Sequence, residues 1–141
     1  PDFVGLENWI NSPEIPSISE LQWKVVMIKF WTLWCINCIN THANTQELYD
    51  RYRDEGLVVI GLHAPEFAYE QKLEAVQKAV DTYGLTFPIA QDNDFQTWKA
   101  YKNRYWPAFY LIDTQWNIRY SFFGEGKYEE KEAAIKELLA E

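Results

Sequence analysis

Two cysteines separated by two residues are the side chains of this sequence best suited to chemistry. Cys35 and Cys38 follow an apolar run rich in β-branched residues over 24–31, which predicts a buried strand. The residues from Cys35 to about Asp54 predict a helix. A cysteine at a helix N-terminus gains thiolate character, and the thiolate is the attacking species in disulfide exchange. The pair therefore indicates redox chemistry, in which the second sulfur resolves a mixed disulfide.

Half a zinc site is the alternative interpretation of the cysteine pair. The sequence has no second cysteine pair, and its two histidines do not have the usual ligand spacing. We therefore expect no metal and no other cofactor. Trp106-Pro107 precedes a predicted strand and is a candidate cis peptide; a trans proline at a strand start is the alternative.

The other predicted strands and helices must position Cys35, Cys38 and Pro107. After an irregular N-terminal arm over 1–20, which includes Pro13, Pro16 and one short edge strand, the pattern alternates strands and helices. Strands are predicted over 57–62, 108–113 and 118–123, and helices over 70–83, 92–101 and 128–141. A βαβ unit followed by a hairpin and a helix predicts an α/β fold with a mixed central sheet and helices on both faces. No linker divides the chain, so one domain over 1–141 is expected.

Composition excludes several classes of function. Acidic residues number 21 and basic residues 13, a formal charge of −8 that argues against nucleic-acid binding. No apolar run approaches the length of a membrane-spanning helix, so membrane insertion is not expected. Aromatic residues are unusually frequent, with seven tryptophans among them.

Four stretches together resemble one family. They are KVVMIKFWTLWCINC, GLVVIGLHAPEFAYE, the DND at 92–94 and NRYWPAFYLID, within about 20–124. The sequence resembles the thioredoxin-like domains of the TlpA/ResA/DipZ group, which serve in cytochrome c biogenesis and thiol reduction. The resemblance implies a thioredoxin fold, Cys35 as nucleophile, Cys38 as resolving thiol and Pro107 as the adjacent cis-proline. It also implies a protein dithiol or disulfide as partner and an extracytoplasmic location for a natural parent.

Several polar residues that depart from the pattern of that group are expected to lie close together, around Lys29. Lys29 stands where such proteins commonly carry an acid, and burial would lower its pKa, making it a poor proton shuttle but a candidate nucleophile. His42 is expected to share a buried pocket with Lys29 beneath the cysteines, and Thr45 and Gln91 add further polar groups. The alternatives are a satisfied core histidine and a lysine that extends to the surface.

The tryptophans divide into two groups. Trp34 and Trp106 fit the rim of a thioredoxin-like active site. Trp23 and Trp116 occupy turn positions where the group usually has glycine, which suits positive φ. We expect these two turns to lie near each other at the sheet end away from the cysteines. There they either clasp a flat aromatic ligand at the mouth of a cavity leading to Lys29 or cover the sheet end.

Two functional hypotheses follow. The first is a thiol–disulfide oxidoreductase that uses Cys35, Cys38 and Pro107. The second is an engineered site in which Lys29 forms a Schiff base with a small aromatic carbonyl compound, as in a retro-aldolase, while His42 moves protons. Ester cleavage by a cysteine paired with His42 is a variant of the second. His63 is interpreted as structural, and Glu66 as a local cap.

Overall fold

A computed structural model describes residues 3–12 and 21–141 of the chain. Pro13 and Pro16 of the predicted arm lie outside the described residues. The strands are β1 (Glu7–Ile10), β2 (Val25–Trp31), β3 (Leu57–His63), β4 (Ile89–Gln91), β5 (Ala108–Ile112) and β6 (Ile118–Phe123). The α-helices are α2 (Ile36–Tyr52), α3 (Leu73–Tyr83), α4 (Gln96–Ala100) and α5 (Tyr128–Ala140), and short 3₁₀ turns cover Arg53–Glu55 and Ala68–Gln71.

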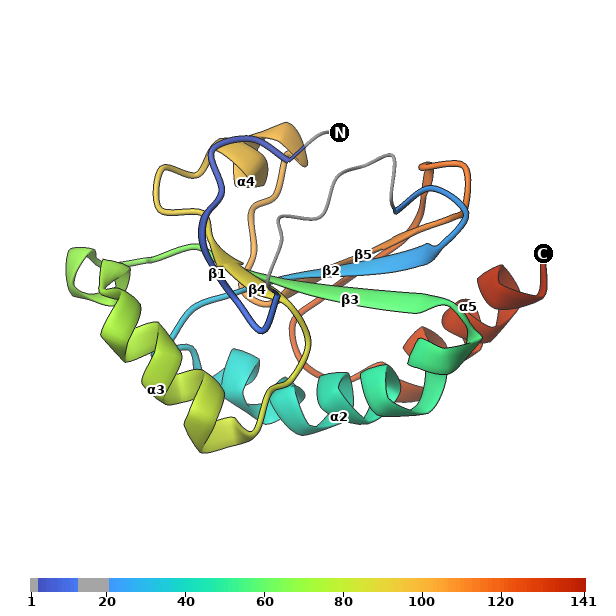
Figure 1. Cartoon of the computed structure of the whole chain (residues 1–141), viewed down its shortest axis with the longest axis horizontal. Coiled ribbons are helices and arrows are strands. Elements are labelled where there is room, and N and C mark those ends of the chain that lie inside the picture. Colours follow the sequence, from blue (N-terminus) through green and yellow to red (C-terminus); the bar gives the residue numbers. More distant parts are fainter. Residues whose placement is uncertain (1–2, 13–20) are drawn as a thin grey trace.

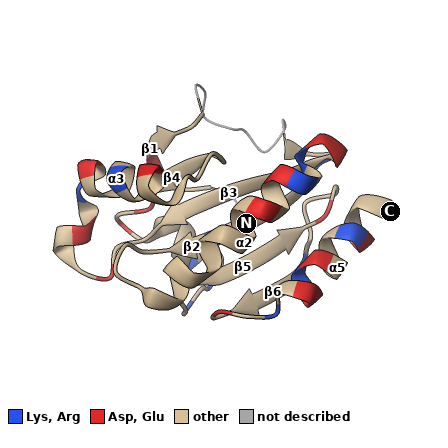
Figure 2. Cartoon of the chain, turned by 90° about the horizontal axis from the view of Figure 1, so that it is seen from below, with Lys and Arg blue, Asp and Glu red and all other residues tan. Residues whose placement is uncertain are grey.

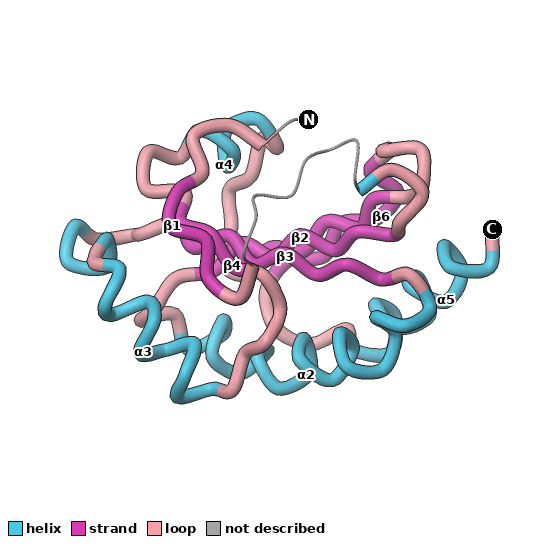
Figure 3. The backbone as a smooth tube through the Cα atoms, viewed as in Figure 1, coloured by secondary structure: helices cyan, strands magenta, loops and turns pink. Residues whose placement is uncertain are grey.

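The strands form one mixed sheet in the order β1-β4-β3-β2-β5-β6 (Figure 3). β2, β3 and β4 are parallel neighbours, whereas β1, β5 and β6 pair antiparallel. β2 is central, and Lys29 on it lies opposite Gly61 of β3 and Phe109 of β5. The predicted α/β class with a mixed central sheet is confirmed.

Helices cover both faces of this sheet. α2, α3 and α5 lie on one side and α4 lies on the other (Figure 1). Side chains of β2 alternate between the two sides, as the period of a strand requires. We call the α2/α3/α5 side the thiol face; from β2 it receives Val25, Met27, Lys29 and Trp31. We call the α4 side the aromatic face; it receives Val26, Ile28 and Phe30.

The central strand and the first long helix follow directly from local sequence. Every residue of β2 is buried, as expected for a continuous apolar run between two helical layers. The segment after α2 ends at Gly56, whose φ of 110° is in the left-handed region that favours glycine. Gly56 then accepts a backbone hydrogen bond from Val25, which ties this turn to the start of β2.

Several boundaries differ from the sequence-based expectations. α3 begins at Leu73 rather than Glu70, because Glu70 belongs to a separate 3₁₀ turn. β4 was not predicted, and β1 is the short edge strand expected in the arm; they pair with each other. Within the described residues, no helix combines the length and apolarity needed to cross a bilayer.

Candidate functional site

Cys35 is the N-cap residue of α2, and Cys38 lies in the first turn of the helix. The backbone N–H of Cys38 donates to Cys35 Sγ at 3.2 Å. Cys35 is half-buried, Cys38 is completely buried, and both are free thiols. A backbone N–H and the positive end of the helix dipole are thus aimed at the Cys35 sulfur. Cys35 therefore has the position of the attacking sulfur, and Cys38 lies one turn behind it.

Trp106 and Pro107 border the exposed side of Cys35. Their peptide bond is cis, as predicted. The Cys35 thiol points at the carbonyl oxygen of Trp106 at a sulfur–oxygen distance of 3.8 Å. The Trp106 indole N–H donates to the carbonyl of Ala64 at 2.8 Å, so the ring is held against the loop that follows β3.

A buried carboxylate that was not singled out from the sequence anchors the loop before the cysteines. Glu70 Oε2 accepts from the Thr32 hydroxyl at 2.8 Å and from the Trp34 backbone N–H at 3.0 Å. Its Oε1 accepts from the backbone N–H groups of Glu66 at 3.0 Å and Phe67 at 2.9 Å. Glu70 is thus the local cap that was assigned to Glu66, because it stands three residues after Phe67 at the start of the 3₁₀ turn. It fixes the residue before Cys35 relative to the end of β3.

Lys29, His42 and Thr45 form a buried group that we call the lysine cluster. Lys29 Nζ lies 2.9 Å from His42 Nδ1 and donates to Thr45 Oγ1 at 3.2 Å. Lys29 is 0% exposed, so its ammonium does not extend to the surface along its methylene stem. The predicted shared pocket of Lys29 and His42 is therefore present, and His42 follows Cys38 by one helical turn on the buried side of α2.

Burial shifts the proton affinities of these groups. Burial lowers the pKa of Lys29 to about 7, while the nearby cysteines oppose that shift and Lys131 reinforces it. Burial, and then the Lys29 charge, lower the pKa of His42 to about 3, so its imidazole is neutral near pH 7. Burial raises the pKa of the Cys38 thiol well above its ordinary value, and the hydrogen bond with Cys35 adds to the rise.

A second buried lysine lies on the same face. Lys131 of α5 places Nζ 3.6 Å from the ring centroid of Phe109, and Lys29 Nζ is 5.6 Å from that centroid. Burial lowers the pKa of Lys131 to about 8. Lys131 was not singled out from the sequence, although it stands four residues before Ile135 and seven before Leu138 and so shares the buried face of α5.

Gln91, which was predicted near the lysine cluster, does not join it. Gln91 is buried at the end of β4, where its side chain accepts from Asn8 at 2.6 Å and donates to the carbonyl of Gln71 at 2.9 Å. It therefore connects β1 to the turn before α3. His63 is completely buried edge-on to Trp31, with ring centroids 4.9 Å apart, and burial lowers its pKa to about 4.

The backbone at Trp23 and Trp116 has a positive φ, as expected for these turn positions. Their φ values are 73° and 65°, and the Trp23 N–H donates to the Thr114 carbonyl at 3.0 Å, so the two turns are adjacent. Trp23 is 79% exposed. Trp116 packs edge-on to Phe3 and against the core of the aromatic face. Lys29 belongs to the opposite face, so the two tryptophans do not frame an opening toward it.

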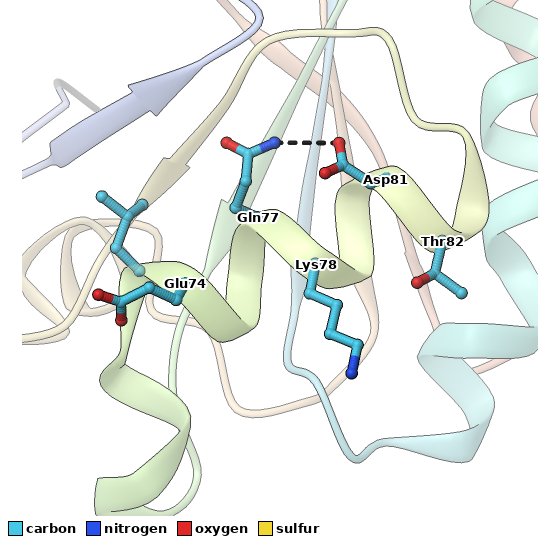
Figure 4. A pocket seen from close by; sticks show the side chains of 6 residues that line it. Glu74, Gln77, Lys78, Asp81 and Thr82 are labelled. Atoms are coloured by element: carbon cyan, nitrogen blue, oxygen red, sulfur yellow. Dashed lines mark hydrogen bonds between the residues drawn. The ribbon is translucent and has the colours of Figure 1, made fainter.

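Two hollows lie along α3. One, of about 360 Å³, is lined by Leu33 and Trp34 from the cysteine loop and by α3 residues including Ala79 and Tyr83. The Tyr83 ring lies 5.1 Å from that of His42, so this hollow adjoins the lysine cluster. The other is lined by residues of α3 that include Gln77 and Asp81, joined by a 3.1 Å hydrogen bond (Figure 4). The second hollow is lined by neither cysteine nor histidine.

Charged residues recur along α2, α3 and α5 (Figure 2). Arg51 of α2, for example, pairs with Glu47 and with Glu132 of α5. Over residues 3–12 and 21–141, no three His, Cys, Asp or Glu side chains come together in a way that could hold a metal ion.

The fold and the cysteine site together define a thioredoxin-like protein. The family model for AhpC/TSA proteins matches residues 2–121, and the chain belongs to that family. The expected similarity to DipZ and ResA is confirmed by the following matches.

Protein DipZ of Mycobacterium tuberculosis is 43% identical over 141 residues, which are 99% of this chain and 20% of DipZ. The thiol-disulfide oxidoreductase ResA of Bacillus thuringiensis is 31% identical over 121 residues, 86% of this chain and 67% of ResA. The crystal structure of a thiol-disulfide isomerase from Corynebacterium glutamicum superimposes with a TM-score of 0.87 at 28% identity, covering 96% of this chain and 93% of that one. The chain thus spans about a fifth of the length of DipZ and most of the smaller relatives.

Proposed function

We propose that this chain is a thiol–disulfide oxidoreductase that acts on protein disulfides or dithiols. The observation that carries the proposal is the Cys38 N–H donated to Cys35 Sγ at 3.2 Å at the start of α2. This sulfur lies on the exposed side of the pair, where a substrate disulfide can reach it. The names of ResA and of the Corynebacterium isomerase, which describe thiol–disulfide chemistry, support the same proposal.

The reaction proceeds in two exchanges. The Cys35 thiolate attacks one sulfur of a substrate disulfide, forms a mixed disulfide and releases the other substrate sulfur as a thiolate. The Cys38 thiolate then attacks Cys35 Sγ, forms the Cys35–Cys38 disulfide and releases the second substrate thiolate. The substrate gains two electrons, the chain loses two, and an external dithiol restores the reduced chain.

The rim residues suit an extended polypeptide substrate. Trp34 is 69% exposed and precedes Cys35 in the chain, and the Cys35 thiol points at the carbonyl oxygen of Trp106, whose bond to Pro107 is cis. We assign Trp34, Trp106 and Pro107 to substrate contact on this basis. Stable disulfide substrates occur in oxidising compartments, so we propose an extracytoplasmic setting.

The lysine-based alternative lacks a comparable observation. Lys29 Nζ is completely buried and is bonded to His42 and Thr45, so a carbonyl compound would have to displace packed side chains to reach it. His42 Nδ1 faces Lys29, and among the described residues His42 Nε2 has no hydrogen-bond partner, so neither nitrogen is paired with a cysteine. The names of DipZ, ResA and the Corynebacterium isomerase do not describe carbonyl or ester chemistry.

Dithiothreitol-dependent reduction of insulin tests the proposal. The wild-type chain is expected to accelerate reduction, and Cys35→Ser is expected to abolish the acceleration. Cys38→Ser should instead accumulate a mixed disulfide on Cys35, visible as a mass increase without reducing agent. A wild-type chain that reacts no faster than dithiothreitol alone contradicts the proposed function.

A further inference from the structure

One of the two hollows along α3 is built in part from the residues that lead into the reactive cysteine. Its volume is about 360 Å³, and one wall consists of Leu33 and Trp34, which directly precede Cys35. The opposite wall is α3, through Ala75, Lys78, Ala79, Thr82 and Tyr83. We call this space the loop hollow. Its volume is at the lower end of the range for ligand sites, which suits a single large side chain better than a cofactor.

Both walls of the loop hollow are held in place by buried groups. The backbone N–H of Trp34 donates to the buried Glu70 carboxylate at 3.0 Å. On the other wall, Val76 of α3 is completely buried in the core of the thiol face. Ala75 and Ala79 stand one helical turn apart, and their small side chains leave the space open. The hollow is therefore part of the folded chain before any substrate binds.

The lining of the loop hollow is largely apolar. Leu33, Ala79 and the Trp34 ring line it, and Trp34 remains 69% exposed next to the reactive cysteine. Apolar surface that stays in water gains free energy when an apolar group covers it. Exposed tryptophan and tyrosine rings are also frequent at the centres of protein contacts. The hollow thus favours an apolar side chain as its occupant.

Lys78 adds one cation to this lining. Glu74 and Asp81 stand four residues before it and three after it on α3, which are spacings at which helical ion pairs form. Within the described part of the chain, Lys78 nevertheless forms no ion pair. Figure 4 shows its side chain pointing away from Asp81, which instead accepts from Gln77 at 3.1 Å. The Lys78 ammonium is therefore free to pair with a carboxylate of a bound molecule.

We propose that the loop hollow is a subsite that binds one large apolar side chain of the polypeptide substrate, with an adjacent carboxylate of that substrate at Lys78. The inference rests on the proposed function and adds a substrate class to it. Because Trp34 adjoins Cys35 and an extended chain advances about 3.3 Å per residue, the occupant stands within a few residues of the substrate cysteine. Preferred substrates therefore carry an aromatic residue beside an acidic one near that cysteine.

Peptides that carry one cysteine as a 2-pyridyl disulfide test the subsite. The Cys35 thiolate attacks the peptide sulfur, forms a Cys35–peptide disulfide and releases pyridine-2-thione, whose absorbance gives the rate. A Phe-Glu pair is placed at successive distances on either side of the peptide cysteine. The 2-pyridyl disulfide of 2-mercaptoethanol is the reference reagent, because it has no side chain to bind.

The wild type should distinguish these peptides. At its best position, the Phe-Glu pair should react about 10-fold faster than Ala-Glu, the scale expected for partial burial of one aromatic ring. It should react about 3-fold faster than Phe-Lys, the scale of an exposed ion pair, and added salt should remove this smaller difference. Equal rates for Phe-Glu and Ala-Glu at every position overturn the inference.

Two variants of α3 separate the two contacts. Ala79→Phe fills the hollow and should remove the preference for Phe-Glu over Ala-Glu. Lys78→Glu should keep that preference and reverse the order of Phe-Glu and Phe-Lys. Each rate is divided by that of the reference reagent with the same variant, so that a general change at Cys35 cancels. Wild-type preferences in both variants contradict the proposed subsite.

Matched controls make the same changes elsewhere. Ala133→Phe fills a separate hollow on α5, and Lys99→Glu reverses a charge on α4, which lies on the other side of the sheet (Figure 1). Both should keep the wild-type preferences. A control that loses the preference for Phe-Glu as fully as Ala79→Phe does would show that the preference does not arise in the loop hollow.

Two other outcomes have distinct meanings. A wild type that sediments as a dimer while Ala79→Phe sediments as a monomer assigns the hollow to a second copy of the chain and overturns the inference. A wild type that releases pyridine-2-thione from the reference reagent no faster than Cys35→Ser contradicts the proposed function. Normal reaction with that reagent and no preference among peptides contradicts the subsite alone, and this comparison requires no variant to fold.

Discussion

The two faces of the central sheet are built from alternate residues of the same strand, yet they differ in chemistry. On the aromatic face, Phe30 meets Trp98, Tyr101 and Tyr110, with ring centroids 5.6–5.9 Å apart. On the thiol face, the neighbouring residue Lys29 contacts His42 and Thr45, and the two cysteines influence its pKa. Adjacent residues of β2 thus face a layer of aromatic rings on one side of the sheet and a buried amine and imidazole on the other.

Because of this difference, we expect the aromatic face to contribute to stability alone and the thiol face to contribute to reactivity as well. Aromatic edge-to-face pairs bury large apolar areas in fixed geometry and respond little to pH. Buried amines and imidazoles impose a desolvation cost that changes as protons bind. We therefore expect substitutions on the aromatic face to change folding alone, and those on the thiol face to change folding, exchange rate and pH dependence together.

The largest effect is expected from Phe30→Ala. Truncating this fully buried ring leaves a cavity among its three aromatic neighbours and should lower the free energy of unfolding by about 3–5 kcal/mol. Urea denaturation measures the loss. The folded fraction should keep the wild-type pH profile of disulfide exchange, and a changed profile would break the distinction between the two faces.

The next effect concerns the pH dependence of stability. The pKa of Lys29 in the folded chain, about 7, lies below the ordinary lysine value of 10.5, so the unfolded chain binds more protons between these pH values. The contribution of Lys29 to stability therefore rises with pH across that window and is least favourable below it. A pKa shift of one unit corresponds to at most about 1.4 kcal/mol of stability. Near pH 7, the free energy of unfolding of Lys29→Met should therefore exceed that of the wild type by roughly 2–4 kcal/mol.

That gain should shrink as the pH approaches 10.5, where a lysine in water loses its proton. Denaturant unfolding of both chains at intervals across the window measures the difference, which isolates Lys29 from other titrating groups. If the difference in free energy of unfolding between the two chains is constant across the window, the pKa of Lys29 is not lowered in the folded chain.

A smaller effect is expected from Glu70→Gln. The amide nitrogen would face N–H donors that now bind a carboxylate oxygen, at a cost of about 1–3 kcal/mol. Because Glu70 holds Trp34 beside Cys35, insulin reduction should also slow. The exposed Glu66→Gln serves as control and should change stability by less than about 0.5 kcal/mol. Equal exchange rates in the two variants would show that the loop keeps its position without Glu70.

The smallest effect is expected from Trp23→Gly. Glycine relieves the left-handed φ of 73° at a side chain that is 79% exposed, so stability should rise by up to about 1 kcal/mol. Trp116 has a similar φ, but Trp116→Gly also removes the ring contact with Phe3, so its stability should not rise. Thermal unfolding compares the two, and a loss of disulfide exchange in Trp23→Gly would restore a functional role for this turn.

The sequence predicts the sheet centre and the cysteine site better than the sheet edge. The buried run ending at Trp31, the cysteines at the start of α2 and the cis Trp106–Pro107 bond all depend on local patterns. The contact between Lys29 and His42 follows because a central strand must pack under the helix that succeeds it. β4 was missed because three residues between Pro88 and Asp92 carry no periodicity.

Contacts between distant segments account for the rest of what was missed. Glu70 binds Trp34 across 36 positions, and no local pattern predicts that pairing. Helical periodicity through Glu70 instead suggested an early start of α3. One of the two expectations for Trp116 placed it at the mouth of a cavity leading to Lys29, but its turn folds toward the other side of the sheet, where Phe3 covers it.

The amine beneath the cysteines also couples electron transfer to proton uptake. A thiolate on a cysteine of the reduced chain favours the Lys29 ammonium, whereas a Cys35–Cys38 disulfide offers no negative charge to do so. Lys29 must then release its proton at a lower pH in the oxidised chain than in the reduced one. Between those two pH values each reduction draws extra protons onto a residue that forms no bond to sulfur, and the reduction potential of the pair falls more steeply with pH.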